Sequence, residues 1–265
     1  MKSPEKSAKR KVVLRELASA EEFIETMDVS KAAWGFADRS VSPATDLIAS
    51  THAGGLTAGA FENGVMLGFV HGIPRTNRDE PCHHSHLLAV RPAAQGRGLS
   101  TLLKLFQRNW CLDHGISLVT WTYDPFLLKN AKLNIGRLRG TVRRILPNFY
   151  GAIGGIYGDL PTDRFEIAWR LDDPLVERAA RGEIHPHPVA PRGLPVATPR
   201  RLPSAPRLLL PFPAGAPGIY RTDPAGSLRA RKSFAKMANE LFARGFHATG
   251  VVERAEGPAY LLEKV

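Results

Sequence analysis

The chain has 265 residues, of which 43% are apolar and 23% are charged. These values are ordinary for a soluble globular protein, and they exclude a collagen-like chain, wholesale disorder and a coiled-coil rod. No apolar run approaches the roughly 18–20 residues that a membrane-spanning helix needs, and no apolar stretch of a secretory signal follows the basic first residues. Two cysteines are too few for a disulfide framework or a four-ligand zinc site. The sequence therefore predicts a cytoplasmic protein with no membrane partner.

The net charge of +11 raises the question of a nucleic-acid partner. Lys and Arg outnumber Asp and Glu by 22 to 18 over residues 1–173, by 5 to 2 over 174–206 and by 9 to 5 over 207–265. An excess that is spread along the chain favours anionic small molecules over sequence-specific DNA recognition. We therefore expect no dedicated nucleic-acid partner.

The distribution of proline divides the chain into parts. Residues 174–217 contain 11 of the 21 prolines. Proline lacks an amide donor and restricts the residue before it, so this stretch is predicted to hold no regular helix or inner strand. We expect a disordered basic tail at 1–10, a body at 11–173, a Pro-rich connector at 174–206 and a C-terminal unit at 207–265.

The body is predicted to mix strands and helices. In chain order we expect a strand at 11–17, helices at 18–27 and 43–50, strands at 56–62, 65–71 and 84–90, a helix at 98–114, a strand at 116–121, a helix at 127–139, and strands at 149–157 and 164–171. Asn63-Gly64 lies between two of these strands and is a strong signal for a type I′ hairpin turn. The order predicts a mixed α/β fold, with a central mixed sheet flanked by helices.

The C-terminal unit is predicted to be a small α/β extension. A strand is expected at 207–210, a helix at 226–244 that Gly245 closes, and strands at 247–252 and 260–262. Residues 207–265 are few for an independent core, so we expect this unit to dock within the chain or onto a second subunit. The sequence does not decide whether the protein forms a homodimer.

The sharpest local feature is the stretch from Val90 to Leu103, in which a strand ends at Arg91-Pro92 and a helix begins after Gly96 and Gly98. Glycines allow a tight turn and let a ligand approach the backbone amides. The first turn of a helix leaves amides unpaired, and the helix dipole adds partial positive charge there. The spacing is that of neither a Rossmann fingerprint nor a nucleotide P-loop. It predicts a pyrophosphate site, or otherwise a plain strand–helix turn.

This stretch resembles the motif of the GNAT superfamily of acyl-CoA-dependent N-acyltransferases. That motif, Gln/Arg-x-x-Gly-x-Gly/Ala, is matched by Gln95, Gly96, Arg97, Gly98 and Leu99, with Ser100 where Gly or Ala is usual. The predicted order of elements over residues 11–171 also matches the superfamily. The resemblance implies a GNAT-like sheet and acetyl-CoA, or another acyl-CoA, as cosubstrate.

The same resemblance implies which groups hold the cosubstrate. The backbone groups of Leu88 and Val90 would contact the pantetheine arm, and the amides of residues 96–100 would hold the pyrophosphate. The strand at 116–121 would splay from the strand at 84–90, and the thioester would enter the gap. Asn130 matches a cofactor-side asparagine of the superfamily; it could otherwise be a residue near a helix cap.

A narrower resemblance indicates the acceptor. Residues 84–88, 121–125, 130–134, 146–151 and 160–165 resemble a bacterial branch of predicted acetyltransferases that carry a C-terminal extension. Relatives in that branch are associated with N-acylamino-acid racemases. The resemblance therefore implies N-acylation of amino acids, with succinyl-CoA as a second candidate donor.

Two histidines are candidates for proton transfer. Histidine is the side chain best suited to accept a proton near pH 7. His84 and His86 alternate with Ser85, so on a strand both project from one face. We expect His86 to be the general base and His84 to be the alternative; either could also be a structural residue. The pair could form half of a metal site, but no third ligand is evident and we expect no metal.

The general acid is harder to assign. The tyrosine that GNAT enzymes usually carry on the helix after the splayed strand corresponds to Ile135, which cannot donate a proton. Tyr150 and Tyr157 are candidate substitutes, and either could instead be an ordinary strand aromatic.

The sequence therefore predicts an N-acyltransferase that moves an acyl group from acyl-CoA to a small-molecule amine by direct attack, with no covalent enzyme intermediate. Two alternatives are a non-catalytic acyl-CoA-binding module and a protein N-acetyltransferase.

Overall fold

A computed structural model describes residues 11–76, 80–151, 153–154, 160–184, 186, 188–212 and 222–265. The predicted tail at 1–10 and Tyr157 lie outside these residues. The chain divides into two compact units. Unit 1 comprises Met1–Pro74 and His86–Asn109, and unit 2 comprises Arg75–Ser85 and Trp110–Val265. The predicted boundary at residue 173 falls inside unit 2, which holds the described residues of the C-terminal extension together with strands of the body.

Unit 1 contains the first strands of the sheet. The antiparallel strands are β1 (Val13–Glu16), β2 (Leu56–Glu62) and β3 (Val65–Thr76), and β3 is followed in the sheet by β4 (Pro81–Val90). The last two residues of β3 and the first five of β4 belong to unit 2. The predicted hairpin is confirmed, because Asn63 and Gly64 have φ values of 53° and 80°, as both central residues of a type I′ turn require.

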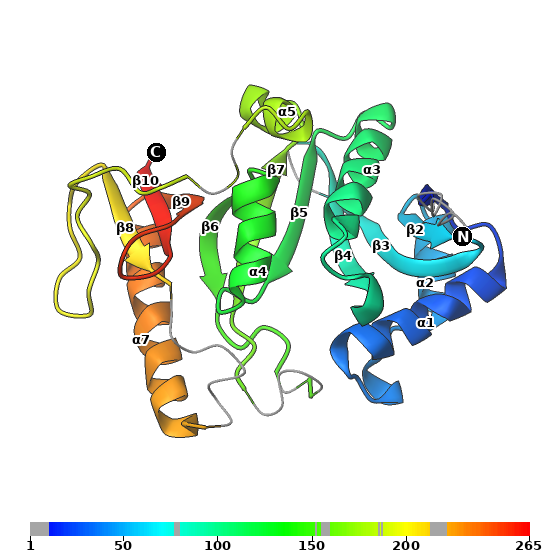
Figure 1. The fold of residues 1–265 in the computed structure, drawn as a ribbon, viewed down its shortest axis with the longest axis horizontal. Helices are drawn as coiled ribbons and strands as arrows, with labels where there is room; N and C mark the ends of the chain where they lie inside the picture. The colour runs from blue at the N-terminus through cyan, green and yellow to red at the C-terminus, as the bar shows by residue number, and fades with distance from the viewer. Residues whose placement is uncertain are drawn as a thin grey trace, which may run out of the picture. The chain divides into compact units, whose positions relative to one another are not determined.

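Helices cover these strands. Figure 1 shows α1 (Ala20–Trp34) and α2 (Ala44–His52) beside β2 and β3, and a short 3-10 turn, η1 (Asp38–Ser40), joins the two helices. A second such turn, η2 (Pro92–Ala94), precedes α3 (Leu99–Asp113). The core of unit 1 consists of Leu17, Phe23, Val29, Ala44, Leu47, Phe61, Met66, Phe69 and Ala89.

Gly68 of β3 lies too close to β4 for a side chain. A Cβ at this position would lie 2.6 Å from the Ala89 carbonyl oxygen. We expect Gly68→Ala to lower the free energy of unfolding by about 1–3 kcal/mol, because the strand must move to relieve the overlap. Urea denaturation measures this change. Gly250→Ala is the matched control, since its Cβ would meet Leu261 at an ordinary 3.4 Å; an equal loss in both variants would contradict the prediction.

Unit 2 continues with antiparallel strands. Their order is β5 (Leu118–Tyr123), β7 (Arg164–Arg170), β6 (Thr141–Leu146), β9 (Phe246–Val252), β10 (Ala259–Lys264) and β8 (Arg207–Pro211). β4 pairs with β5 in parallel at Cys82, His83 and His84. Parallel and antiparallel pairs together confirm the predicted mixed α/β class.

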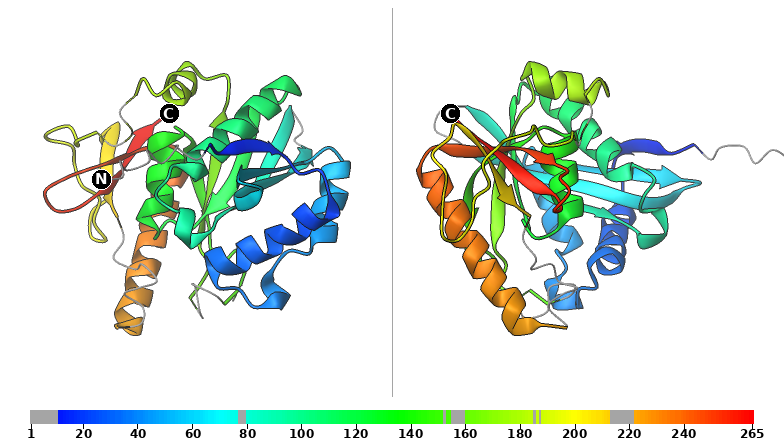
Figure 2. Two further views of the ribbon diagram at one scale, coloured as in Figure 1. Left: turned by 45° about the vertical axis from the view of Figure 1, so that its right-hand side comes forward. Right: turned by 60° about the vertical axis from the view of Figure 1, so that its left-hand side comes forward.

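The helices of unit 2 pack against its strands. The helix after β5 comprises α4 (Leu128–Ala131) and a π-helical segment, η3 (Lys132–Arg137). The long orange helix in Figures 1 and 2 is α7 (Pro224–Ala243), which packs against β6 and β9. No helix in the described parts of the chain is both long and apolar enough to cross a bilayer.

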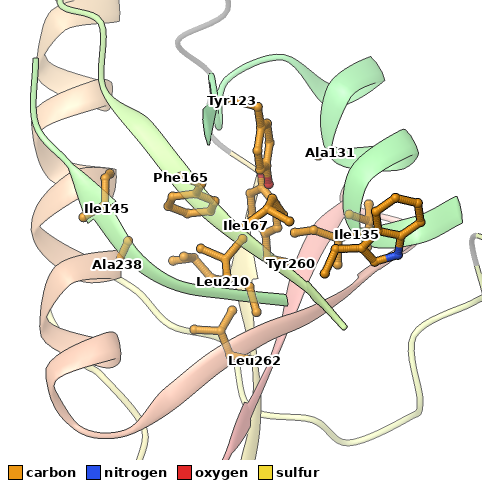
Figure 3. Packing of buried hydrophobic residues seen from close by; sticks show 14 of the residues in the cluster. Tyr123, Ala131, Ile135, Ile145, Phe165, Ile167, Leu210, Ala238, Tyr260 and Leu262 are labelled. Carbon is orange, nitrogen blue, oxygen red and sulfur yellow. The ribbon is translucent and has the colours of Figure 1, made fainter. Parts of the chain in front are cut away.

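The core of unit 2 joins the C-terminal extension to the body. Phe165 of β7 packs against Phe234 and Phe242 of α7 and against Tyr260 of β10, with ring centroids 5.3–5.8 Å apart. Figure 3 shows side chains from six elements that meet there: Tyr123, Ile145, Phe165, Ile167, Leu210, Ala238, Tyr260 and Leu262. The extension therefore contributes to the same hydrophobic core as β5 and β7.

The structure corrects three predictions of secondary structure. The Pro-rich stretch contains a helix, α5 (Pro174–Ala180), because Pro174 occupies the first helical position and Asp173 caps it. β6 was missed, since a bulge between Val142 and Arg144 breaks the alternation of its apolar residues. Residues 147–150 form a turn in place of the predicted strand at 149–157, whose remaining residues lie mostly outside the described parts.

Candidate active site

The loop between β4 and α3 has the geometry that a phosphate-binding turn requires. Gly96 and Gly98 adopt left-handed φ values of 82° and 79°, and a Cβ at either position would meet no atom within 4 Å. Arg97, which lies between them, forms an ion pair with Glu62 at 2.5 Å. Two glycines thus turn the backbone tightly and leave open space above it.

Five consecutive amides at this turn are available to an anion. The first intrahelical bonds run from Thr101 and Leu102 to the Gly98 carbonyl, at 3.0 and 3.1 Å. The N–H groups of residues 96–100 have no acceptor within the described residues. They lie just before and within the first turn of a helix of 15 residues, whose dipole adds partial positive charge. The residues present therefore fit a pyrophosphate group.

The backbone of β4 offers further polar groups. The Arg91 amide donates to the Leu67 carbonyl at 2.8 Å, so Arg91 faces β3. Because backbone groups alternate sides along a strand, those of Val90 and Leu88 point away from β3. The Val90 carbonyl accepts a hydrogen bond from Gln95 Nε2 at 3.2 Å. Gln95 thus ties the loop to the strand end.

His86 lies exposed on β4, and partial desolvation of its ring lowers its pKa below the usual value. It meets the edge of a second histidine, His71 of β3, with ring centroids 6.4 Å apart. His71 is buried and bonded through both ring nitrogens, to Thr57 Oγ1 at 2.8 Å and to Ser50 Oγ at 3.2 Å. Burial lowers the pKa of His71 to about 4, so the ring stays neutral near pH 7.

The other predicted catalytic residues, His84 and Tyr150, belong to unit 2. His84 Nδ1 lies 3.2 Å from Thr120 Oγ1, and the Tyr150 hydroxyl lies 3.2 Å from Thr122 Oγ1. Thr120 and Thr122 are two residues apart on β5 and so share one face. The structure thus brings His84 and Tyr150 to the same face of one strand.

The helix after β5 carries Asn130 and Ile135. Asn130 is the third residue of α4 and is half-buried; the helix cap is Leu127, so Asn130 lies in the first turn, close to the cap. Ile135 is fully buried in the π-helical segment. Ile135 therefore cannot act as the general acid, as the sequence predicted for this position.

Sequence reasoning missed three polar residues near these groups. His71 lies in an apolar strand and gives no motif. Arg75, at the end of β3, forms an ion pair with Glu166 of β7 at 3.6 Å, and Arg144 holds the same carboxylate at 2.5 and 3.0 Å. Burial alone would raise the pKa of Glu166, but the hydrogen bond from Arg144 lowers it, so Glu166 stays ionised near pH 7. Only strand pairing reveals these contacts.

Within the described residues, no three His, Cys, Asp or Glu side chains gather closely enough to hold an ion.

Comparisons with known proteins agree with this geometry. Residues 16–132 match the family model "Acetyltransferase (GNAT) family". A search of the curated proteins found no match.

Three solved structures share the fold, each with a TM-score of 0.50. A protein from Desulfovibrio desulfuricans described as an acetyltransferase of the GNAT family is 17% identical and covers 61% of this chain and 99% of its own. The ribosomal-protein-S18-alanine N-acetyltransferase from Escherichia coli is 16% identical and covers 62% and 96%. A protein from Acinetobacter baylyi described as an acetyltransferase is 15% identical and covers 63% and 96%.

These structures are matched over almost their whole length, whereas more than a third of this chain lies outside the shared fold. The part that matches the family model, residues 16–132, contains the strand, loop and helix that present the five amides. Residues 16–132 are therefore similar to the acetyltransferase domain of the GNAT family, and the chain shares the fold of these solved structures.

Proposed function

We propose that the protein transfers an acyl group from acetyl-CoA, or from succinyl-CoA, to the amino group of a small molecule, an amino acid being the first candidate. The observation that carries this proposal is the row of five amides at residues 96–100, beside two glycines with open space above them. Such a row suits the pyrophosphate of coenzyme A. The backbone groups of Leu88, which point away from β3, suit the amides of the pantetheine arm.

His86 is proposed as the general base. It accepts one proton from the acceptor ammonium, and the neutral amine nitrogen then forms a bond to the thioester carbonyl carbon. The C–S bond breaks, the sulfur leaves as the thiolate, and the second proton released by the nitrogen neutralises that thiolate. Tyr150 is the candidate relay for that second proton, because its hydroxyl can donate a proton to the sulfur and recover one from the nitrogen, and it lies on the face of β5 that also meets His84.

His86→Ala is expected to lower kcat by about 10²–10⁴, with little change in acyl-CoA affinity. In the wild type, kcat/KM should fall as the pH drops through a midpoint below 6.5, because the lowered pKa keeps His86 neutral to more acidic pH. The variant should lose this limb. A thiolate-release assay over a pH series measures both effects. His84→Ala is the matched variant. If His84→Ala alone loses the fall of kcat/KM at acidic pH, His84 is the base.

A non-catalytic acyl-CoA-binding module is the second candidate, and Ile135 is the observation that favours it. A buried aliphatic side chain stands where the general acid is expected. Calorimetry with acetyl-CoA and thiolate release with amines and short peptides separate the candidates. Tight binding without turnover for any acceptor would support the module, and turnover of peptides alone would support a protein acceptor.

A further inference from the structure

One face of the sheet in unit 2 carries a group of polar side chains, which we call the polar face: Arg75, His84, Thr120, Thr122, Arg144, Tyr150 and Glu166. The strand register places Thr122 opposite Glu166, and Glu166 opposite Arg144. Side chains directly opposite one another lie on the same face of a sheet. The polar face therefore crosses β5, β7 and β6, and the intervening residues of β5 and β7 point to the buried core.

The polar face continues to the strand that carries the predicted bases. His84 of β4 lies opposite Thr120 in the parallel pair, and the two side chains are in contact at 3.2 Å. Arg75 reaches the same hydroxyl, with NH1 3.0 Å from Thr120 Oγ1. A molecule bound on this face thus lies beside His84, the alternative base of the proposed function.

Arg75 retains capacity to bind an anion. A guanidinium has five N–H donors, and within the described residues Arg75 uses one of them, toward Thr120. Its ion pair with Glu166 is long, at 3.6 Å, whereas Arg144 contacts both oxygens of that carboxylate. Since Arg144 compensates Glu166, the positive charge of Arg75 is left largely uncompensated, and its side chain is 40% exposed.

We propose that the polar face is the acceptor subsite and that the acceptor is an amine that also carries a carboxylate, which the Arg75 guanidinium binds. This inference rests on the proposed N-acyl transfer. A planar guanidinium matches a carboxylate through two parallel hydrogen bonds, which fixes the orientation of the bound molecule. The Thr122 and Tyr150 hydroxyls, linked at 3.2 Å, lie on the same face and provide further polar partners.

The test compares each L-amino acid with its C-terminal amide, which lacks the negative charge. Binding to the full-length protein is measured by ligand-observed NMR, and turnover is measured separately by thiolate release from acetyl-CoA. We expect at least one amino acid to bind about tenfold or more tightly than its amide. In Arg75→Gln the amino acid and the amide should bind equally, and Arg75→Lys should keep part of the preference.

Arg181→Gln is the control, because it removes an exposed arginine outside the polar face. It should bind like the wild type. A preference that survives in Arg75→Gln, amides that bind as well as acids, or the absence of binding by any amino acid would each overturn the inference. Acid-selective binding that depends on Arg75 but comes with no acyl transfer would instead contradict the proposed function.

Discussion

Gly98→Val is expected to weaken acyl-CoA binding by about 10²-fold or more. Valine does not tolerate the left-handed φ of 79° at this position, so the loop must leave the conformation that aligns its amides. Hydrogen bonds to a charged group contribute about 1.5–3 kcal/mol each, and the loss of two accounts for the expected change. Calorimetric titration with acetyl-CoA measures the affinity.

A control variant must show that the loss of affinity does not come from backbone strain alone. Gly35→Val is the matched control, because Gly35 also has a left-handed φ, 64°, and a Cβ there would also meet no atom within 4 Å. It ends α1 and is not part of the loop. We expect a similar loss of stability in both variants and a loss of affinity in Gly98→Val alone. Unchanged affinity in folded Gly98→Val would remove the main support for the proposed cosubstrate site.

Features encoded within a few residues were predictable from the sequence. Asn63-Gly64 specifies its turn because few other residues tolerate positive φ at both positions. Gly96 and Gly98 specify the loop for the same reason. β6 was not predictable, because the exposed Arg143 and Arg144 interrupt its pattern and the strand is held by pairing with β7 and β9.

The same distinction between local motifs and strand pairing applies to the candidate site. The proposed phosphate site at residues 96–100 is a local motif, and the sequence predicted its glycine turn. Arg75 and Glu166 are 91 positions apart in sequence, and only the order of strands in the sheet brings them together. The hydrogen bond between His71 and Thr57 likewise depends on the pairing of two neighbouring strands. Positions of chemical interest that depend on strand pairing have no signature in one sequence.

A buried charged group links the C-terminal extension to β5. Asp124, directly after β5, is fully buried and lies 3.5 Å from Arg231 of α7 and 3.9 Å from Arg164. Burial raises the pKa of Asp124, so its charge depends on these two arginines. Arg231 also stacks on Phe126, at 3.9 Å from the ring centroid. A buried carboxylate that loses its partner costs about 3–5 kcal/mol.

Removal of residues 207–265 is expected to leave unit 2 unfolded and aggregation-prone. The truncation deletes Arg231 and the aromatic residues Phe234, Phe246 and Tyr260, all of which are buried. Each buried apolar side chain contributes about 1.5–3 kcal/mol, so the combined loss, with that of the ion pair, is comparable to the whole stability of an ordinary domain, about 5–15 kcal/mol. Light scattering and circular dichroism of the truncated protein measure this outcome.

Point variants separate the contribution of the Asp124–Arg231 ion pair to stability from that of the buried apolar side chains. Arg231→Ala should destabilise the full-length protein by about 3–5 kcal/mol. Arg229→Ala, at an exposed position of the same helix, should change stability by less than about 0.5 kcal/mol. A truncated protein that stays monodisperse and keeps full turnover would show that β5 and β7 fold without the extension. In that case the shared core around Phe165 would be dispensable, and the extension would be a separate module attached to a complete acetyltransferase domain.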